Sequence, residues 1–163
     1  MNKRYKIIIK EKLISLGYSV SDDLIPLAKY KSYSLTEKLV FVSGQLPITK
    51  GEILSTGKIG REINMEKAKE SIKLATVNLL LVLNKITIEN NINPNQIKCI
   101  NIKGYLNCID SFSEHSKLFN ASSELIIEVL GDIHGSHSRS VIGVHSLPLD
   151  SPIEIDGTFS ILK

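Results

Sequence analysis

Apolar residues recur at helical spacing in the stretch that follows Asn64. Steps of four, three, four, three and four residues line one face of an α-helix. These steps connect Ala68, Ile72, Ala75, Leu79, Val82 and Ile86. Asn64 is suited to the N-cap position, and Glu66 is favourable in the first turn. Pro94 lies between two asparagines and marks a turn. The pattern predicts one long helix that ends before this turn.

Two further helices are predicted. The first covers at least residues 118–130 and ends at Gly131, a residue type common just after a helix. Its inward face holds Leu118, Ala121, Leu125 and Val129. The second is a short N-terminal helix over residues 4–16, which closes before Gly17.

Strand-like runs fill most of the remaining chain. The run 39–42 (LVFV) is continuously apolar, which is typical of a strand buried on both faces. A loop or irregular hairpin is expected over 48–63, where three glycines occur. The other predicted strands are 30–34, 97–107, 138–145 and 153–161.

The order of these elements is α-β-β-α-β-α-β-β. It predicts the α/β (α+β) class, with one mixed sheet and two long helices on one of its faces. No repeat or linker divides the chain, so a single domain is expected over residues 1–163. Within it, residues 1–26 form an N-terminal helical extension and residues 27–163 form the core.

Side chains alternate between the two faces of each strand. In 97–107, the alternation puts Ile100, Ile102 and Leu106 on one face. In 138–145, one face holds Arg139, Val141 and Gly143, and the other holds Ser140, Ile142 and Val144. In 153–161, one face holds Ile153, Ile155, Phe159 and Ile161, and the other holds Glu154, Asp156, Thr158 and Ser160. Helices on one face leave the other apolar face bare. Another subunit is therefore expected to cover Ile153, Ile155 and Phe159 or their neighbours.

Composition agrees with a folded domain. The chain has 163 residues, 42% of them hydrophobic, and a net charge of +3. Its lysines are dispersed, which does not favour a nucleic-acid partner. Charged residues at 10–12 interrupt the apolar N-terminal stretch, and the apolar runs are shorter than the roughly 20 residues of a membrane span. A cytoplasmic location without a membrane partner is expected.

The two cysteines do not predict a disulfide. A strand between Cys99 and Cys108 would hold them roughly 30 Å apart. Both are expected to be buried apolar side chains rather than reactive thiols. His134, His137 and His145 lack the further ligands that a metal site needs, so no metal and no cofactor is expected.

Two charged residues on predicted strands are candidates for chemistry. Arg139 follows the loop GDIHGSHS, and a guanidinium held on a strand offers a rigid fork of donors to a carboxylate or phosphate. A salt bridge or simple exposure is the alternative. Glu154 could position a water or act as a general base. It could equally be an ordinary polar residue of a half-exposed strand.

Several stretches together resemble the RidA/YjgF family, also labelled the endoribonuclease L-PSP family. They occur in family order from residue 28 onwards: AKYKSY (28–33), LVFVSGQLP (39–47), GKIG (57–60), LFNASSELIIEVLG (118–131), HSRSVIGVHSLP (137–148) and IEID (153–156). The N-terminal helix and the Gly-x-His-x-Arg motif, which includes His137, resemble a less-studied branch of the family.

The resemblance implies a chorismate-mutase-like homotrimer with ligand clefts between subunits. It implies that Arg139 holds a substrate carboxylate and that Glu154 orients the attacking water. It also places Tyr30, Ser43, Gly44 and Asn120 in the substrate-binding cleft.

The implied reaction is hydrolytic deamination of 2-imino acids to 2-keto acids and ammonia, without a cofactor. Val141 stands where studied deaminases of the family carry a cysteine, which leaves a non-catalytic, trimeric ligand-binding or regulatory protein as the alternative. Ribonuclease or translation-inhibitor activity is less favoured, because aromatic residues make up 6% of the chain and tryptophan is absent.

Overall fold

A computed structural model describes residues 9–20 and 30–162 of the chain. Its main sheet has five strands in the order β1-β2-β7-β5-β6. β5 and β6 run parallel, whereas the other neighbouring strands are antiparallel. The bounds are β1 Tyr33–Thr36, β2 Leu39–Gln45, β5 Ile97–Asn107, β6 Ser138–Val144 and β7 Ile153–Ile161.

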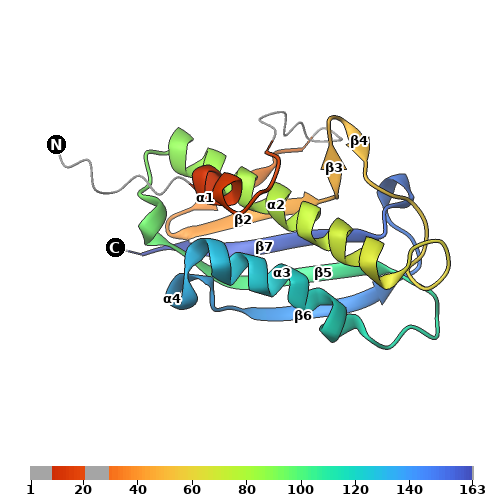
Figure 1. Cartoon of the computed structure of the whole chain (residues 1–163). Helices are drawn as coiled ribbons and strands as arrows, with labels where there is room; N and C mark the ends of the chain where they lie inside the picture. Colours follow the sequence, from red (N-terminus) through yellow and green to blue (C-terminus); the bar gives the residue numbers. More distant parts are fainter. Residues whose placement is uncertain (1–8, 21–29, 163) are drawn as a thin grey trace.

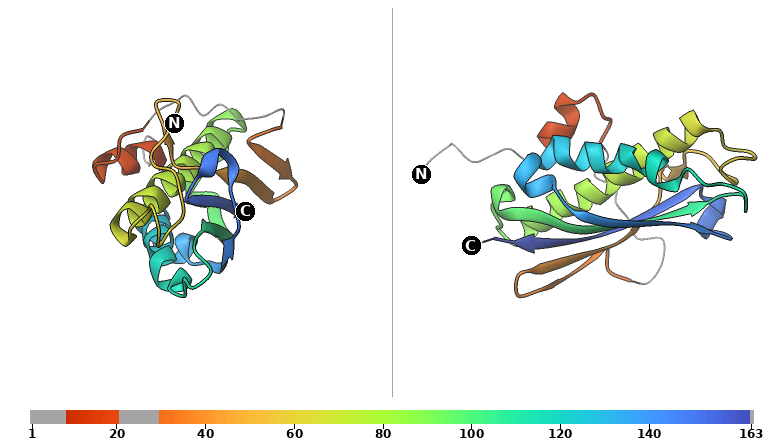
Figure 2. Two further views of the ribbon diagram at one scale, coloured as in Figure 1. Left: turned by 90° about the vertical axis from the view of Figure 1, so that its right-hand side faces the viewer. Right: turned by 90° about the horizontal axis from the view of Figure 1, so that it is seen from below.

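The long helices cover one face of this sheet, and the opposite face is open (Figure 1 and Figure 2). They are α2 (Met65–Glu89) and α3 (His115–Leu130). Short α1 (Ile9–Ser15) packs on the outside of these helices, and one-turn α4 (Asp132–Gly135) follows α3. A small hairpin of β3 (Ile48–Thr49) and β4 (Glu52–Ile53) lies apart from the sheet. The predicted fold class is confirmed.

The helix α2 begins and continues as its sequence predicts. Asn64 Oδ1 accepts a hydrogen bond from the Lys67 amide at 3.0 Å, which caps the first turn. Every member of the predicted apolar stripe is buried. The helix is long and apolar enough to cross a membrane by length and composition, but 78% of its most apolar window is buried inside the fold. That burial is the property of a core helix.

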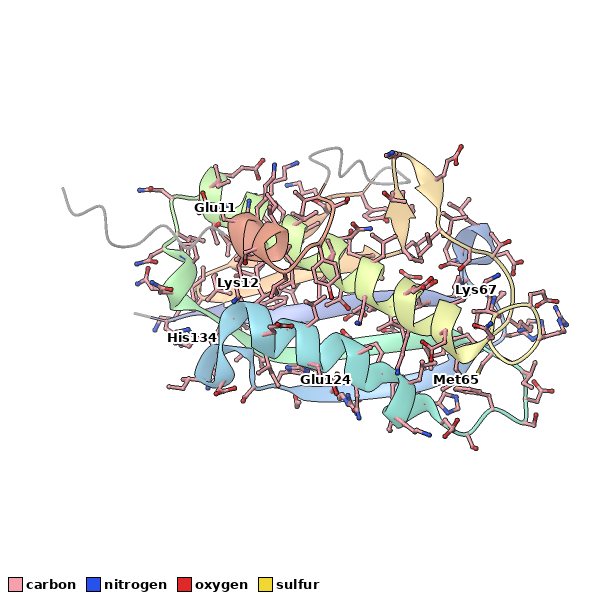
Figure 3. All side chains as sticks on the ribbon, viewed as in Figure 1. Glu11, Lys12, Met65, Lys67, Glu124 and His134 are labelled. Atoms are coloured by element: carbon pink, nitrogen blue, oxygen red, sulfur yellow. The ribbon has the colours of Figure 1, made fainter. Side chains whose placement is uncertain are left out.

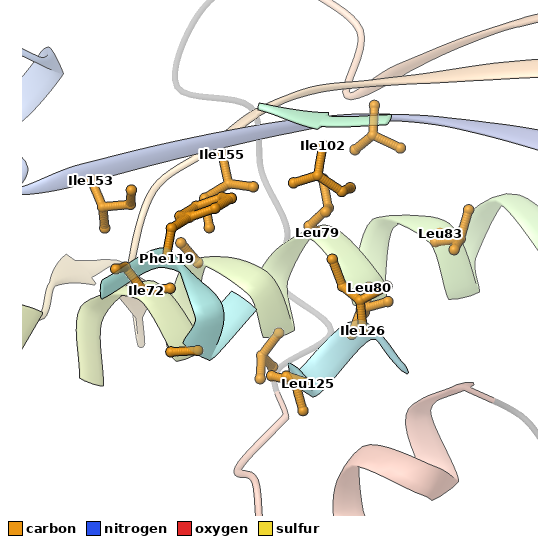
Figure 4. Close-up of a cluster of buried hydrophobic side chains, with 14 of the residues drawn as sticks. Ile72, Leu79, Leu80, Leu83, Ile102, Phe119, Leu125, Ile126, Ile153 and Ile155 are labelled. Carbon is orange, nitrogen blue, oxygen red and sulfur yellow. The ribbon is translucent and has the colours of Figure 1, made fainter. Parts of the chain in front are cut away.

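The core lies between the helices and the sheet (Figure 4). Phe119 of α3 is fully buried and lies directly over Gly104 of β5, where a Cβ atom would overlap the aromatic ring. Thr76 of α2 donates a hydrogen bond of 2.9 Å to Ser122 of α3, so the helix pair is joined by a satisfied polar contact. Charged side chains such as Glu124 lie on the outer side of the helices (Figure 3).

Two expectations about strand faces are wrong. The register between β5 and β7 shifts between Cys99 and Asn101, so Ile100 is the extra residue of a β-bulge. Ile100 is exposed, while Cys99 and Ile102 are buried. In a single chain, residues 39–42 are also not buried on both faces of the strand, contrary to the expectation. Val40 and Val42 are buried, but Leu39 and Phe41 remain 39% and 44% exposed.

The open face of the sheet is not formed by the apolar residues of β7 that the sequence pattern indicated. Ile153, Ile155 and Phe159 are fully buried beneath the helices, so they need no second subunit. Their neighbours on the opposite face are the partly exposed Glu154, Asp156, Thr158 and Ser160.

Element ends differ slightly from the sequence-based prediction. The first strand begins at Tyr33 rather than Tyr30, and α3 begins at His115. Residues 4–8 of the predicted N-terminal helix, and most of the segment 17–29, lie outside the described residues, whereas 9–15 are helical.

The contact between Gly104 and Phe119 predicts a coupled effect on stability. Gly104→Ala should lower the free energy of unfolding by about 1–3 kcal/mol, because the new methyl group displaces a packed ring. Combining it with Phe119→Leu should cost less than the sum of the two single changes, since the smaller side chain leaves room for the methyl group. Urea denaturation of the four proteins measures the coupling. Strict additivity would contradict the contact.

Candidate functional site

Arg139 lies on β6 with its side chain directed towards α3. Its guanidinium donates three hydrogen bonds, to Ser123 Oγ at 3.0 Å, Ser116 O at 3.0 Å and Asn120 Oδ1 at 2.8 Å. The guanidinium carbon also lies 5.8 Å from the ring centroid of Phe119. These contacts hold the planar group in one orientation beside the helix.

The partners of Arg139 share one side of α3 because of helical spacing. Residues 116, 120 and 123 are four and three positions apart, so they face the same way. Phe119, on the adjacent inward side, anchors the helix to β5 through its contact with Gly104. The packing of α3 on the sheet therefore determines where the guanidinium lies.

His137 extends this network behind Ser123. Its Nδ1 lies 2.5 Å from Gly135 O, a carbonyl that can only accept, so Nδ1 carries the proton. In the neutral ring, Nε2 then accepts a hydrogen bond of 3.0 Å from the Ser123 hydroxyl, which leaves Ser123 Oγ free to accept from Arg139. His137 is thus a positioning residue for Arg139, with Ser123 between them.

Glu154 lies on β7, half-buried, and touches the turn at Gly44. A Cβ atom at residue 44 would overlap the carboxylate, so glycine is required for this close approach. Burial, and secondarily the charge of Asp156, raises the pKa of Glu154. Asp156 itself accepts a hydrogen bond of 2.8 Å from the Tyr105 hydroxyl. A carboxyl with a raised pKa is suited to accepting a proton from water.

The end of β2 that carries Ser43 and Gly44 is held from both sides. The register of β2 against β7 shifts between Val42 and Gln45, which places Gly44 in a bulge. Ser43 Oγ donates to Lys31 O at 2.8 Å, next to the exposed Tyr30. On the helix side, the buried Asn78 of α2 donates 2.9 Å hydrogen bonds to the carbonyls of Leu46 and Ile48.

The predicted site residues therefore form two groups. The arginine group comprises Asn120 and Arg139, together with Ser123 and His137. The glutamate group comprises Ser43, Gly44 and Glu154. Tyr30 is not brought into contact with them and adjoins this group only as the chain neighbour of Lys31.

The two groups lie on opposite faces of the sheet. Ile102 of β5 pairs with Arg139 of β6, and its buried side chain points to the helices. Tyr105, three residues further along β5 and thus on the other face, pairs with Glu154. Side chains of paired residues share a face, so Arg139 points to the helices and Glu154 to the open face.

Sequence reasoning missed Ser116 and Ser123. Ser123 could have been found from its i+3 spacing to Asn120 on a predicted helix, because that spacing shares a face. The Ser116 contact uses a backbone carbonyl, which leaves no residue-specific signal in the sequence.

Among residues 9–20 and 30–162, no group of three or more His, Cys, Asp or Glu side chains could hold a metal ion. The absence of metal from the functional protein stays a prediction.

Comparison with known proteins gives the family. A family model described as "YjgF/chorismate mutase-like, putative endoribonuclease" matches residues 10–156. The chain belongs to this family. Among its relatives, protein TCP17 of Trypanosoma cruzi is 26% identical over 148 residues, which cover 91% of each chain.

Two solved structures with a YjgF-like fold are also similar. Atu1372 of Agrobacterium tumefaciens, a protein of unknown function, is 31% identical with a TM-score of 0.81, over 94% of this chain and 92% of that one. A Shewanella oneidensis protein with the description "putative endoribonuclease" is 25% identical with a TM-score of 0.81, over 94% of this chain and 99% of that one.

The raised pKa of Glu154 predicts a pH-dependent stability. The folded chain holds this proton more tightly than the unfolded chain, whose pKa is about 4.5. The stabilisation is complete below that value and is lost as the pH rises through the folded pKa. The free energy of unfolding of Glu154→Gln should therefore rise relative to that of wild type as the pH is raised from about 4 to about 7.

Urea denaturation across this pH range measures the effect. Glu124→Gln, on the exposed outer side of α3, is the matched control and should show a constant difference from wild type. Parallel curves for Glu154→Gln and wild type would contradict the raised pKa.

Proposed function

We propose that this YjgF-family chain binds small carboxylates through Arg139 and hydrolyses 2-imino acids to 2-keto acids and ammonia. The observation that carries the proposal is that the Arg139 guanidinium is held in place while some of its N–H donors remain unused. Three of its five N–H donors are spent on α3, and the other two have no hydrogen-bond partner among the described residues. The two are Nε–H and one Nη1–H, and each can donate a charge-assisted hydrogen bond to a carboxylate oxygen.

The proposed site requires two copies of the chain. Arg139 and Glu154 point to opposite faces of one sheet, so the pair cannot act on one ligand within a single copy. A second copy could bring its glutamate group to the arginine group of the first, as the expected homotrimer would. Leu39, Phe41 and Ile142 support such a contact, because they leave apolar surface 39–52% exposed on the open face.

The proposed chemistry uses positioning and charge. Arg139 binds the carboxylate of the imino acid. Glu154 of the second copy takes a proton from a water molecule as the oxygen of that water bonds to the imine carbon. The proton taken up by Glu154 passes to the imine nitrogen, which completes a carbinolamine. The hydroxyl proton of the carbinolamine then moves to nitrogen as the C–N bond breaks and the C=O bond forms, which releases ammonia and the keto acid. Fixed groups reduce the entropy cost of bringing water and imine together.

Val141 favours a second candidate, in which the site binds keto or imino acids without turnover. It lies two residues after Arg139 on the same face of β6 and is partly buried against the core. An apolar side chain there offers no thiol to the ligand. Keto-acid release from imines generated by an amino-acid oxidase separates the two candidates, and cleavage of RNA by the purified chain would support a ribonuclease instead.

Replacing Arg139 by lysine should abolish tight carboxylate binding. A lysine ammonium cannot reproduce the planar set of donors that α3 holds in place, and loss of a charge-assisted pair costs roughly 2–5 kcal/mol, or about 30- to 4,000-fold in affinity. Calorimetry with pyruvate measures the change. Arg61→Lys, the same substitution at an exposed arginine, is the control and should bind as wild type does. Unchanged pyruvate affinity in a folded Arg139→Lys protein would refute the clamp.

Mixed assemblies test the two-copy site. Arg139→Ala and Glu154→Gln chains should each be inactive in imine hydrolysis. After co-refolding at equal amounts, about one quarter of the sites of a random cyclic assembly combine an intact Arg139 with an intact Glu154. Turnover should therefore return to about a quarter of the wild-type rate. Mixed assemblies as inactive as the single variants would contradict an intersubunit site.

A further inference from the structure

A pocket of about 370 Å³ lies where β5 and β6 end beside the first turn of α3. Cys108, Phe112, His115, Gly143 and His145 are among the residues that line it. Arg139 and Glu154 are not among them. The pocket lies towards the end of β6 away from Arg139, since Gly143 lies four residues further along β6.

Cys108 and His115 form a thiol–imidazole pair in this pocket. Cys108 Sγ lies 3.6 Å from His115 Nε2. Gly143 makes the pairing possible, because a Cβ atom there would lie 2.9 Å from both Sγ and Nε2. The Phe112 ring and the imidazole pack edge to face, at a centroid distance of 5.0 Å and an interplanar angle of 73°. The histidine ring is therefore held facing the sulfur.

The two cysteines occupy different environments. Cys99 is enclosed by the core at 1% exposure, and burial raises its pKa to about 12. It fits the expectation of an inert apolar side chain. Cys108 is 7% exposed but borders the pocket, and its pKa is raised chiefly by burial, with Lys58 acting in the opposite direction. Its sulfur is thus a protonated thiol that needs a base before it can act as a nucleophile.

The base is supplied by the neighbouring ring. A nucleophile within hydrogen-bond reach of a base, with that base held by a third group, is the arrangement of activated nucleophiles. Here the nucleophile is Cys108, the base is His115, and Phe112 holds the ring. Around the pair, Lys58 fixes the backbone by donating hydrogen bonds of 2.5 Å to His145 O and 3.5 Å to Cys108 O.

We propose that Cys108 and His115 form a second reactive site, which captures small α,β-unsaturated carbonyl compounds. His115 Nε2 takes the thiol proton as Sγ bonds to the β-carbon, and the electron pair of the C=C bond moves to the enolate. The imidazolium then returns the proton to the α-carbon. The net step adds S–H across C=C, so it needs no oxidant, reductant, water or leaving group.

Addition is the chemistry that this pair can complete alone. The same proton leaves sulfur and reaches carbon, so one imidazole serves as base and then as acid. The product remains covalently attached to Cys108, which makes the site a stoichiometric trap. It does not depend on the imine-hydrolysis proposal, because it uses neither Arg139 nor Glu154.

Labelling of the intact protein with acrylamide tests the proposal. Mass spectrometry should show one adduct per wild-type chain, and peptide mapping should place it at Cys108 rather than Cys99. Cys108→Ser should abolish it and Cys99→Ser should leave it unchanged. His115→Gln should slow labelling by at least about tenfold, since a general base contributes that much or more. Arg139→Lys should label at the wild-type rate, which separates this result from the fate of the carboxylate clamp.

Two further variants make the outcome decisive. His145→Gln alters a pocket residue other than the hydrogen-bonding partner of the sulfur and should label at the wild-type rate. Gly143→Ala should slow labelling as His115→Gln does, because its methyl group separates the pair. The proposal is overturned if folded wild-type protein labels Cys108 no faster than urea-unfolded protein does, or if His115→Gln and Gly143→Ala both keep the wild-type rate.

Discussion

The packing of α2 and α3 on one face of the five-stranded sheet is the constraint on which the rest of the structure depends. It gives every strand a helix side and an open side, and strand alternation then assigns each side chain to one of them. Arg139 falls on the helix side and Glu154 on the open side. One physical arrangement thus explains both why the core is closed and why the two candidate groups are separated within a chain.

Close backbone approaches adjust this arrangement at three glycines. Gly104 admits the ring of Phe119, which anchors α3 and with it the partners of Arg139. Gly44 admits the carboxylate of Glu154 against the bulge of β2, and Gly143 admits the contact between Cys108 and His115. At Gly44 and Gly143 a methyl group would overlap or crowd a side chain that the proposed chemistry uses, and at Gly104 it would overlap the ring that anchors α3. The absence of a side chain is therefore as much a part of these sites as the charged groups are.

The polar groups of the candidate site are held by a network rather than by single pairs. Gly135 O, His137, Ser123 and Arg139 form a chain in which each donor has a defined acceptor. A guanidinium placed this way needs little reorganisation to meet a ligand. On the other face, burial of Glu154 keeps its carboxyl closer to the protonated form than a solvated glutamate. The two faces thus offer a fixed cation and an adjustable proton acceptor.

Hydrophobic periodicity in the sequence determined the elements, their order and the fold class. It also determined which side chains of β6 and β7 share a face, because an unbroken alternation needs no tertiary information, but it did not determine which face of β7 the helices cover. It could not locate the bulge at Ile100, since an extra strand residue appears only in the pairing with β7. The family motifs named Arg139 and Glu154, but only the sheet register showed that they point apart. Likewise, nothing in the sequence distinguishes Cys108 from Cys99. Cys108 is the neighbour of His115 only because the ends of β5 and β6 and the start of α3 meet around a pocket. Contacts between distant segments depend on packing, and packing is decided by the folded chain as a whole.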